Sequence, residues 1–186
     1  MISPEQDAQI EFTPNNFLNS FFVTAKTVLL SPGSFYERMK TNGGLRNPLI
    51  FLVCCVLVHT FIVGLFVTKQ AIIAFNLING IIMPFVTAWL LFFIATRLFK
   101  ASGDYATAFR VNAYAEATAL FSWIPVIGPF LQFYRFYLIV VGLSRTFSIR
   151  ISQALLAIVI TVIIYIVTLG PIMAHILGGQ APTVVP

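Results

Sequence analysis

The sequence predicts an all-α integral membrane protein with five transmembrane helices, preceded by an amphipathic helix in the membrane interface. Of its 186 residues 59% are hydrophobic and 9% are charged, whereas roughly 25% of a soluble domain is charged. A mean hydropathy of +0.93 leaves more apolar side chains than one compact core can bury. Apolar segments of bilayer length also recur along the chain between short basic segments. These observations exclude a soluble globular protein.

The first segment, residues 1–14, is predicted to be a polar N-terminal tail. It carries Glu5, Asp7 and Glu11 and has no basic region before an apolar stretch, so it does not have the form of a secretory signal peptide. We therefore expect the N-terminus to stay in the cytoplasm.

Residues 15–46 are predicted to form cytoplasmic amphipathic or interfacial helices. At 100° per residue the apolar side chains of the first helix share an arc of about 140°; they are Phe17, Leu18, Phe21, Phe22, Ala25, Val28 and Leu29. A helix of this length is too short to cross a bilayer, which favours a position in the interface. Phe17, Phe21 and Leu29 are the candidate membrane-surface face.

Local signals set the limits of these first helices. Thr13 and Pro14 have the form of an N-cap and a first helical turn. Ser31-Pro32-Gly33 breaks the helix, and the pattern from Ser34 to Glu37 predicts a capping box at the start of a second short helix.

Residues 47–178 are predicted to form the membrane domain. Gly128-Pro129 predicts a tight turn between the third and fourth segments, and Gly170-Pro171 predicts a bend or an end in the fifth. Residues 179–186 would form an extracytoplasmic tail. The five apolar segments are Pro48–Val67, Ala71–Leu98 with Pro84 inside it, Arg110–Ile127, Pro129–Leu143 and Ile151–Leu177.

Basic residues predict the orientation of these segments. Only Lys69 lies on the other side of the membrane, so the positive-inside rule places the N-terminus in the cytoplasm and the C-terminus outside. Because these residues flank apolar spans, the positive net charge does not indicate a nucleic-acid partner. The residues on the cytoplasmic side are Lys26, Arg38, Lys40, Arg46, Arg97, Lys100, Arg110, Arg145 and Arg150.

Motifs for enzymatic chemistry are missing from the sequence. Cys54 and Cys55 are neighbours on one helix and point about 100° apart, so they cannot form an unstrained disulfide with each other. There is no zinc-type Cys/His spacing, glycine-rich phosphate loop or hydrolase motif. We expect no enzyme activity, no metal and no cofactor.

Two ionisable residues inside the spans form the main candidate site. Glu116 lies six residues, or about 9 Å, from Arg110, and Arg135 lies ten residues, or about 15 Å, from the same side of the membrane. The two segments are hairpin neighbours, so a buried ion pair between Glu116 and Arg135 is expected. Such a pair fixes helix packing or lines a polar path, and the sequence leaves both roles open.

Other polar residues extend this candidate network. Gln132 lies three residues before Arg135 and hence on the same helix face. Asn79 is predicted to hydrogen-bond between helices, and His59 to be a neutral donor to a carbonyl. The alanines at 113, 115, 117 and 119 form two small-xxx-small pairs that favour close helix packing.

The order of these motifs resembles the Ypt-interacting protein (YIP) family. The motifs are the amphipathic helix, Ser31-Pro32-Gly33 followed by Ser-Phe, the start at Gly103-Asp104-Tyr105 and the hairpin Ile124–Pro129. The resemblance covers residues 17–177. Eukaryotic relatives work with Rab-type GTPases and carry an Asp-Leu-Tyr-Gly-Pro motif that this chain lacks, so the chain resembles the prokaryotic branch. That resemblance implies the bacterial inner membrane and does not extend to a Rab partner.

Two functions remain open, and a membrane enzyme ranks behind both. In the first, the protein is a membrane scaffold or partner-binding protein that contacts the lipid bilayer, including anionic lipids, and assembles with itself or with another membrane protein. In the second, it is a small oligomeric transporter or channel subunit whose polar path includes Glu116, Arg135, Gln132 and Asn79. Access of water to Glu116 or Arg135 distinguishes the two functions.

Overall fold

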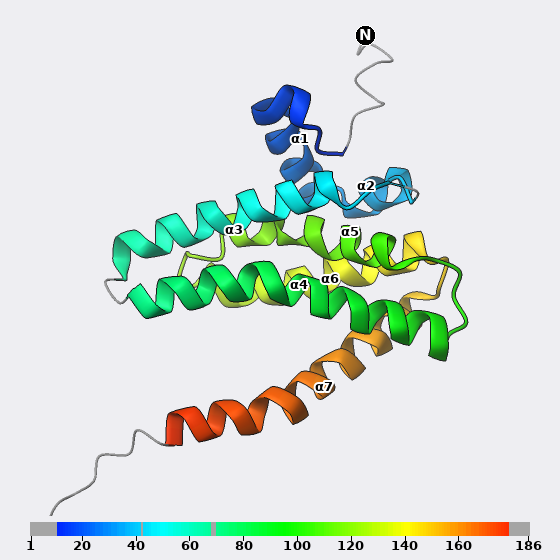
Figure 1. Ribbon diagram of the computed structural model, residues 1–186. Coiled ribbons are helices and arrows are strands. Elements are labelled where there is room, and N and C mark those ends of the chain that lie inside the picture. Colours follow the sequence, from blue (N-terminus) through cyan, green and yellow to red (C-terminus); the bar gives the residue numbers. More distant parts are fainter. Residues whose placement is uncertain (1–10, 42, 68–69, 179–186) are drawn as a thin grey trace, which may run out of the picture.

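The chain is described by a computed structural model for residues 11–41, 43–67 and 70–178, and these residues form helices without a strand (Figure 1). This confirms the all-α fold class. The elements are the 3-10 turn η1 (Pro14–Asn16), α1 (Phe17–Leu30), α2 (Pro32–Arg38), α3 (Arg46–Phe66), α4 (Gln70–Leu98), α5 (Tyr105–Ala115), the 3-10 helix η2 (Glu116–Leu120), α6 (Ile127–Thr146) and α7 (Ile151–Gly178).

Four of the described helices are long and apolar enough to cross a membrane. They are α3, α4 from Ile73, α6, and α7 as far as Thr168, with mean hydropathies between 1.3 and 2.8. At most 33% of any of these segments is buried inside the protein, so most of their side chains face outward. Apolar side chains directed outward over this length are suited to hydrocarbon. The expectation of a multi-pass membrane protein is thereby supported.

The third predicted span has a different structure. It is divided into the eleven-residue helix α5 and the 3-10 helix η2, and every side chain from Thr107 to Thr118 is buried. This segment packs against α3, α4 and α6. Ala113, Ala115 and Ala117 are fully buried. Their small side chains let the surrounding helices approach this segment closely. Its neighbours therefore enclose the third segment.

Two predicted boundaries shift for local reasons. α5 begins at Tyr105 and not near Arg110, because the Asp104 side chain accepts the N–H of Thr107 at 2.7 Å and caps the helix. The hairpin turn lies at 121–126, and Gly128-Pro129 is part of the first turn of α6. Proline is tolerated there because a first-turn N–H has no partner within the helix. α7 likewise continues past Gly170-Pro171 to Gly178.

The first two helices lie against the side of the bundle. α1 is drawn above α3 in Figure 1 and packs through Phe21, whose ring centroid lies 5.2 Å from that of Phe51. Its N-terminal turn begins at Pro14 as predicted, although the Thr13 side chain makes no capping hydrogen bond.

Helix α2 packs against α6 and begins three residues earlier than a capping box at Ser34 requires. The capping-box prediction is therefore wrong: Ser34 lies inside the helix, and its hydroxyl accepts a hydrogen bond from Arg38.

Helix α2 also contacts α5 through Tyr36, whose hydroxyl donates to the Val111 carbonyl at 3.2 Å. Burial raises the pKa of the Tyr36 phenol, which keeps it protonated as a donor. A Cβ at Gly142 would overlap Val111, so only glycine permits this close packing.

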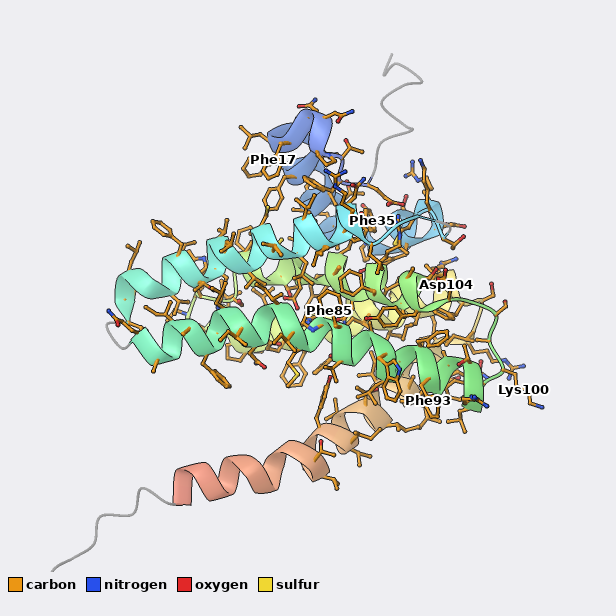
Figure 2. All side chains as sticks on the ribbon, viewed as in Figure 1. Phe17, Phe35, Phe85, Phe93, Lys100 and Asp104 are labelled. Carbon is orange, nitrogen blue, oxygen red and sulfur yellow. The ribbon has the colours of Figure 1, made fainter. Side chains whose placement is uncertain are left out.

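Turns at one end of the bundle bring the basic residues together. In Figure 1, α3, α5 and α7 begin at the end where α4 and α6 finish, and Figure 2 shows Lys100 and Asp104 there. Lys100 and Ser148 have left-handed backbones, with φ of 52° and 53°, after α4 and α6. We call this the basic end; its exposed cations are Arg38, Lys40, Arg46, Arg97, Lys100, Arg145 and Arg150. Lys69 lies outside the described residues.

Candidate functional site

An ion pair lies in the middle of the bundle. Arg135 extends from α6, and its Nη2 pairs with Oε1 of Glu116 at the start of η2. The Glu116 side chain is 7% exposed and that of Arg135 is 22% exposed. The structure therefore brings together the two residues that sequence depth and hairpin connectivity indicated.

Asn112 connects this pair to a further helix. Its Oδ1 accepts from Nη2 of Arg135 at 3.5 Å, and its Nδ2 donates to the Pro84 carbonyl in α4 at 2.9 Å. The network thus joins α4, α5, η2 and α6. Sequence reasoning missed Asn112, although its position four residues before Glu116 is a usable signal for one shared helix face.

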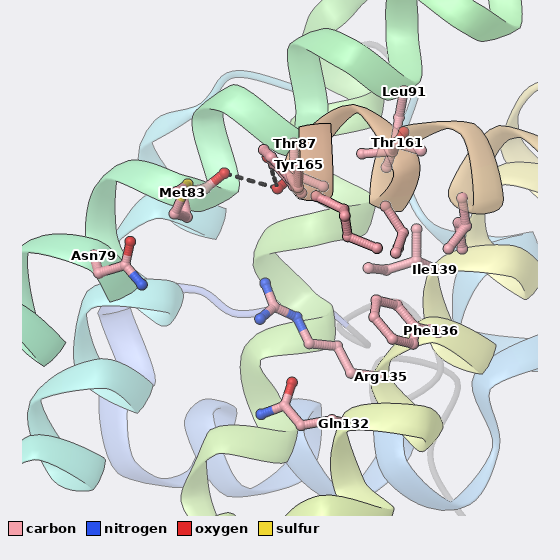
Figure 3. A pocket seen from close by; sticks show the side chains of 13 residues that line it. Asn79, Met83, Thr87, Leu91, Gln132, Arg135, Phe136, Ile139, Thr161 and Tyr165 are labelled. Carbon is pink, nitrogen blue, oxygen red and sulfur yellow. Dashed lines mark hydrogen bonds between the residues drawn. The ribbon is translucent and has the colours of Figure 1, made fainter. Parts of the chain in front are cut away.

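An open-sided cavity of about 460 Å³ lies next to Arg135, between α4, α6 and α7. Figure 3 shows Arg135 directed into it, with Gln132 nearby and Asn79 on the facing helix. The Thr87 and Tyr165 hydroxyls hydrogen-bond at 2.8 Å across the α4–α7 side. Most of the remaining wall is apolar: Met83, Leu91, Phe136, Ile139, Ile158, Val162 and Ile166.

The other two candidate network residues share the cavity with Arg135. Gln132 and Asn79 are both exposed and line its wall. Within the described part of the chain, neither amide has a hydrogen bond to Arg135 or Glu116. The four predicted residues are therefore an ion pair and two neighbouring amides. They do not form one hydrogen-bonded network.

A second buried ion pair lies on another side of α5. Nη2 of Arg110 pairs with Oε2 of Glu11, and its Nη1 donates to the Gly44 carbonyl at 3.0 Å. Glu11 also accepts from the Tyr114 hydroxyl at 3.3 Å and from the backbone N–H of Lys40. Sequence reasoning missed this cluster, since it assigned Glu11 to a polar tail and Arg110 to the set of orienting cations.

The candidate membrane-surface face of α1 is divided by the fold. Phe21 is buried against α3, Phe17 is 42% exposed and Leu29 is half-buried. The most exposed members of the apolar arc are instead Leu18 and Phe22, at 69% and 65%. An apolar arc also serves to pack a helix on its own protein, and periodicity does not distinguish the two uses.

His59 and the cysteines lie outside the cavity. Nδ1 of His59 is 3.1 Å from both the Ala119 carbonyl and the Ser122 hydroxyl. Cys54 and Cys55 are free thiols. In the described ranges there is no group of three or more His, Cys, Asp or Glu side chains that could hold a metal ion.

In this arrangement the Arg135 guanidinium pairs with the buried Glu116 carboxylate on one side and lines the open-sided cavity on the other. A family model for the Yip1 domain matches residues 26–172, which include the last turn of α1, all of α2 to α6 and most of α7. No curated protein and no solved structure matches the chain. Since the matched region covers well over half of its length, this membrane protein belongs to the Yip1 domain family.

Proposed function

We propose that the protein is a non-enzymatic membrane scaffold that gathers anionic lipids and membrane-protein partners at its basic end. The supporting observation is the clustering of exposed arginine and lysine side chains at the turns before α3, after α4 and after α6. Glu37 and Asp104 are the exposed acidic residues of these turns within the described ranges. Each basic residue near an anionic surface contributes about 1 kcal/mol of attraction.

The proposed topology has five crossings, with the basic end in the cytoplasm and the C-terminus outside. In this arrangement α5 and η2 form an inner crossing enclosed by α3, α4 and α6, and α1 lies at the cytoplasmic interface. The positive-inside rule supports this orientation, and the resemblance to the prokaryotic branch of the family supports a bacterial inner membrane. Reporter fusions should place the two termini on opposite sides, whereas termini on the same side would contradict five crossings.

Lipid clustering tests the scaffold function directly. The full-length protein is reconstituted into phosphatidylcholine vesicles that contain a minor fraction of phosphatidylglycerol, with donor and acceptor fluorophores on the anionic lipid. Energy transfer should increase with the protein and fall when Arg97, Lys100 and Arg145 are all replaced by glutamine. Arg97→Lys, Lys100→Arg and Arg145→Lys together are the matched control, because they change the same three side chains and keep their positive charge. Equal energy transfer with parent and triple variant would reject the function.

A transporter or channel subunit, acting as an oligomer, is the second candidate. The supporting observation is that Arg135, Gln132 and Asn79 line an open-sided cavity. Solute flux through reconstituted vesicles that ceases on Gln132→Phe would favour this function over the scaffold.

A further inference from the structure

The cavity between α4, α6 and α7 has a chemical character that a scaffold acting through its basic end does not use. Arg135 is the charged residue among the side chains that line it, and no acidic side chain is among them in the described part of the chain. Glu116 contacts Arg135 from the protein side and is not part of the lining. The cavity therefore presents a cation to whatever enters it.

Arg135 retains hydrogen-bonding capacity toward this space. A guanidinium has five N–H donors, and both Glu116 and Asn112 contact the same nitrogen, Nη2. Nε of Arg135 has no partner among the described residues, but it is buried in the same way as Nε of Arg110, so the donors left for the cavity are those of the terminal nitrogens. An arginine at membrane depth is costly unless its donors find acceptors. Gln132 and Asn79 add amide donors and amide acceptors to the lining, but no lining side chain in the described ranges carries the negative charge that would balance Arg135.

The shape of the cavity indicates where the acceptor comes from. Arg135 is eight residues from Ile127, so it lies about 12 Å below that end of α6. The cavity is open-sided, and some of its lining residues are exposed, with Ile166 at 65% and Phe136 at 38%. In Figure 1, α7 diverges from the other helices toward its C-terminal end. In the topology proposed above, this opening faces the hydrocarbon of the bilayer, where lipids are the available molecules.

We propose that this cavity binds one anionic lipid, with its phosphate or carboxylate oxygens against Arg135 and the amide of Gln132. An acyl chain lies along the apolar wall formed by Met83, Phe136 and Ile166. The volume of about 460 Å³ falls within the 300–1,000 Å³ of typical ligand pockets. The head group enters from the side between α4 and α7, and the rest of the lipid stays in the bilayer. This site is separate from the basic end.

Native mass spectrometry of the full-length protein in detergent tests the proposal. Phosphatidylglycerol, phosphatidylcholine and oleate are titrated separately, so that phosphate and carboxylate head groups are distinguished. Gln132→Phe fills the cavity and removes the amide donor at an exposed position. Glu116→Gln combined with Arg135→Gln removes the cation without leaving Glu116 unpaired. Arg145→Gln is the matched control, since it removes one positive charge at the basic end.

The expected result is one tightly held phosphatidylglycerol or oleate per chain, and at least tenfold weaker binding of phosphatidylcholine. Gln132→Phe and the double variant should each weaken the anionic lipid at least tenfold, whereas Arg145→Gln leaves it unchanged. A thermal melt of each variant verifies folding, and Asn79→Leu replaces Gln132→Phe if that variant unfolds. Any of three results would overturn the proposal. Phosphatidylcholine could bind as tightly as the anionic lipids, or Arg145→Gln could weaken the anionic lipid as much as the cavity variants do. The third is a lipid-free dimer in which a second copy fills the cavity.

Discussion

The two buried ion pairs of this bundle have the same chemistry in different surroundings. Arg110 is 3% exposed, and its two terminal nitrogens contact Glu11 and the Gly44 carbonyl. Arg135 is 22% exposed and faces a cavity on one side. The guanidinium of the first pair is enclosed by protein, whereas that of the second faces an open-sided cavity. The same Arg–Glu contact therefore serves to close the structure in one region and leaves binding capacity in the other.

The difference follows from what the carboxylates accept. Glu11 accepts hydrogen bonds from Arg110, Tyr114 and the backbone of Lys40, and so it joins three separate segments of the chain. Glu116 pairs with Arg135 alone among the described residues. A buried ion pair stabilises a fold when its remaining donors and acceptors are also satisfied. Nε of Arg110 and Nε of Arg135 are both buried without a partner among the described residues, so the difference lies in the carboxylates: the Glu11 cluster is the structural anchor because its carboxylate joins three segments.

The largest expected effect is at the central pair. Arg135→Gln leaves the nearly buried Glu116 unpaired and should destabilise the protein by about 3–5 kcal/mol. Glu116→Gln should cost less, because Arg135 retains access to the cavity. The double replacement should recover part of the loss, as measured by thermal unfolding of the four variants in detergent. Additive or negligible effects would contradict a packed ion pair and favour an aqueous path.

Removing the anchor carboxylate should have the next largest effect. Glu11→Gln weakens three hydrogen bonds, one of them from a guanidinium, and should cost about 1.5–3 kcal/mol. Amide hydrogen exchange should become faster in residues 11–41 and stay unchanged in α6. Glu37→Gln, at an exposed position on α2, is the control and should leave exchange as in the parent. Uniformly faster exchange throughout the bundle would show that the pair is not a local anchor.

Close packing of α2 and α5 on α6 gives the third prediction. Gly142→Ala would place a Cβ into Val111 and against the Tyr36 ring, so it should cost about 1–3 kcal/mol through overpacking. Gly33→Ala is the matched control, because a Cβ there meets no atom within 4 Å. Chemical denaturation in detergent compares the two variants. Equal midpoints would mean that this side of the bundle is as loosely packed as the cavity side.

The smallest effect is expected on the outward side of α1. Replacing Leu18 and Phe22 together by serine removes exposed apolar side chains and should change stability in detergent by about 0.5 kcal/mol or less. Phe21→Ser, its buried neighbour, should be clearly destabilising in the same thermal melt. If the double variant is as unstable as Phe21→Ser, then the exposed edge of α1 is part of the packed structure.

Much of the architecture could be predicted from apolar length. Helices α3, α4 and α7 begin and end within a few residues of the predicted bounds, which were Pro48–Val67, Ala71–Leu98 and Ile151–Leu177. The bounds of the segment predicted from Arg110 to Ile127 were less accurate. This segment is buried by other helices, so it does not need an apolar stretch as long as the bilayer is thick. The Glu116–Arg135 contact could be predicted from the sequence, because each residue of a helix advances 1.5 Å and the two residues therefore lie at similar depths.

Composition and periodicity alone determined the membrane class, the helical segments and the gathering of basic residues at one end, because these depend on how each residue partitions between water and hydrocarbon. The tertiary structure decided what each apolar or charged group faces. It buried Phe21 and Arg110, exposed Leu18 and opened a cavity beside Arg135. These outcomes depend on how close helices approach in space, and a single helix period carries no information about its neighbours.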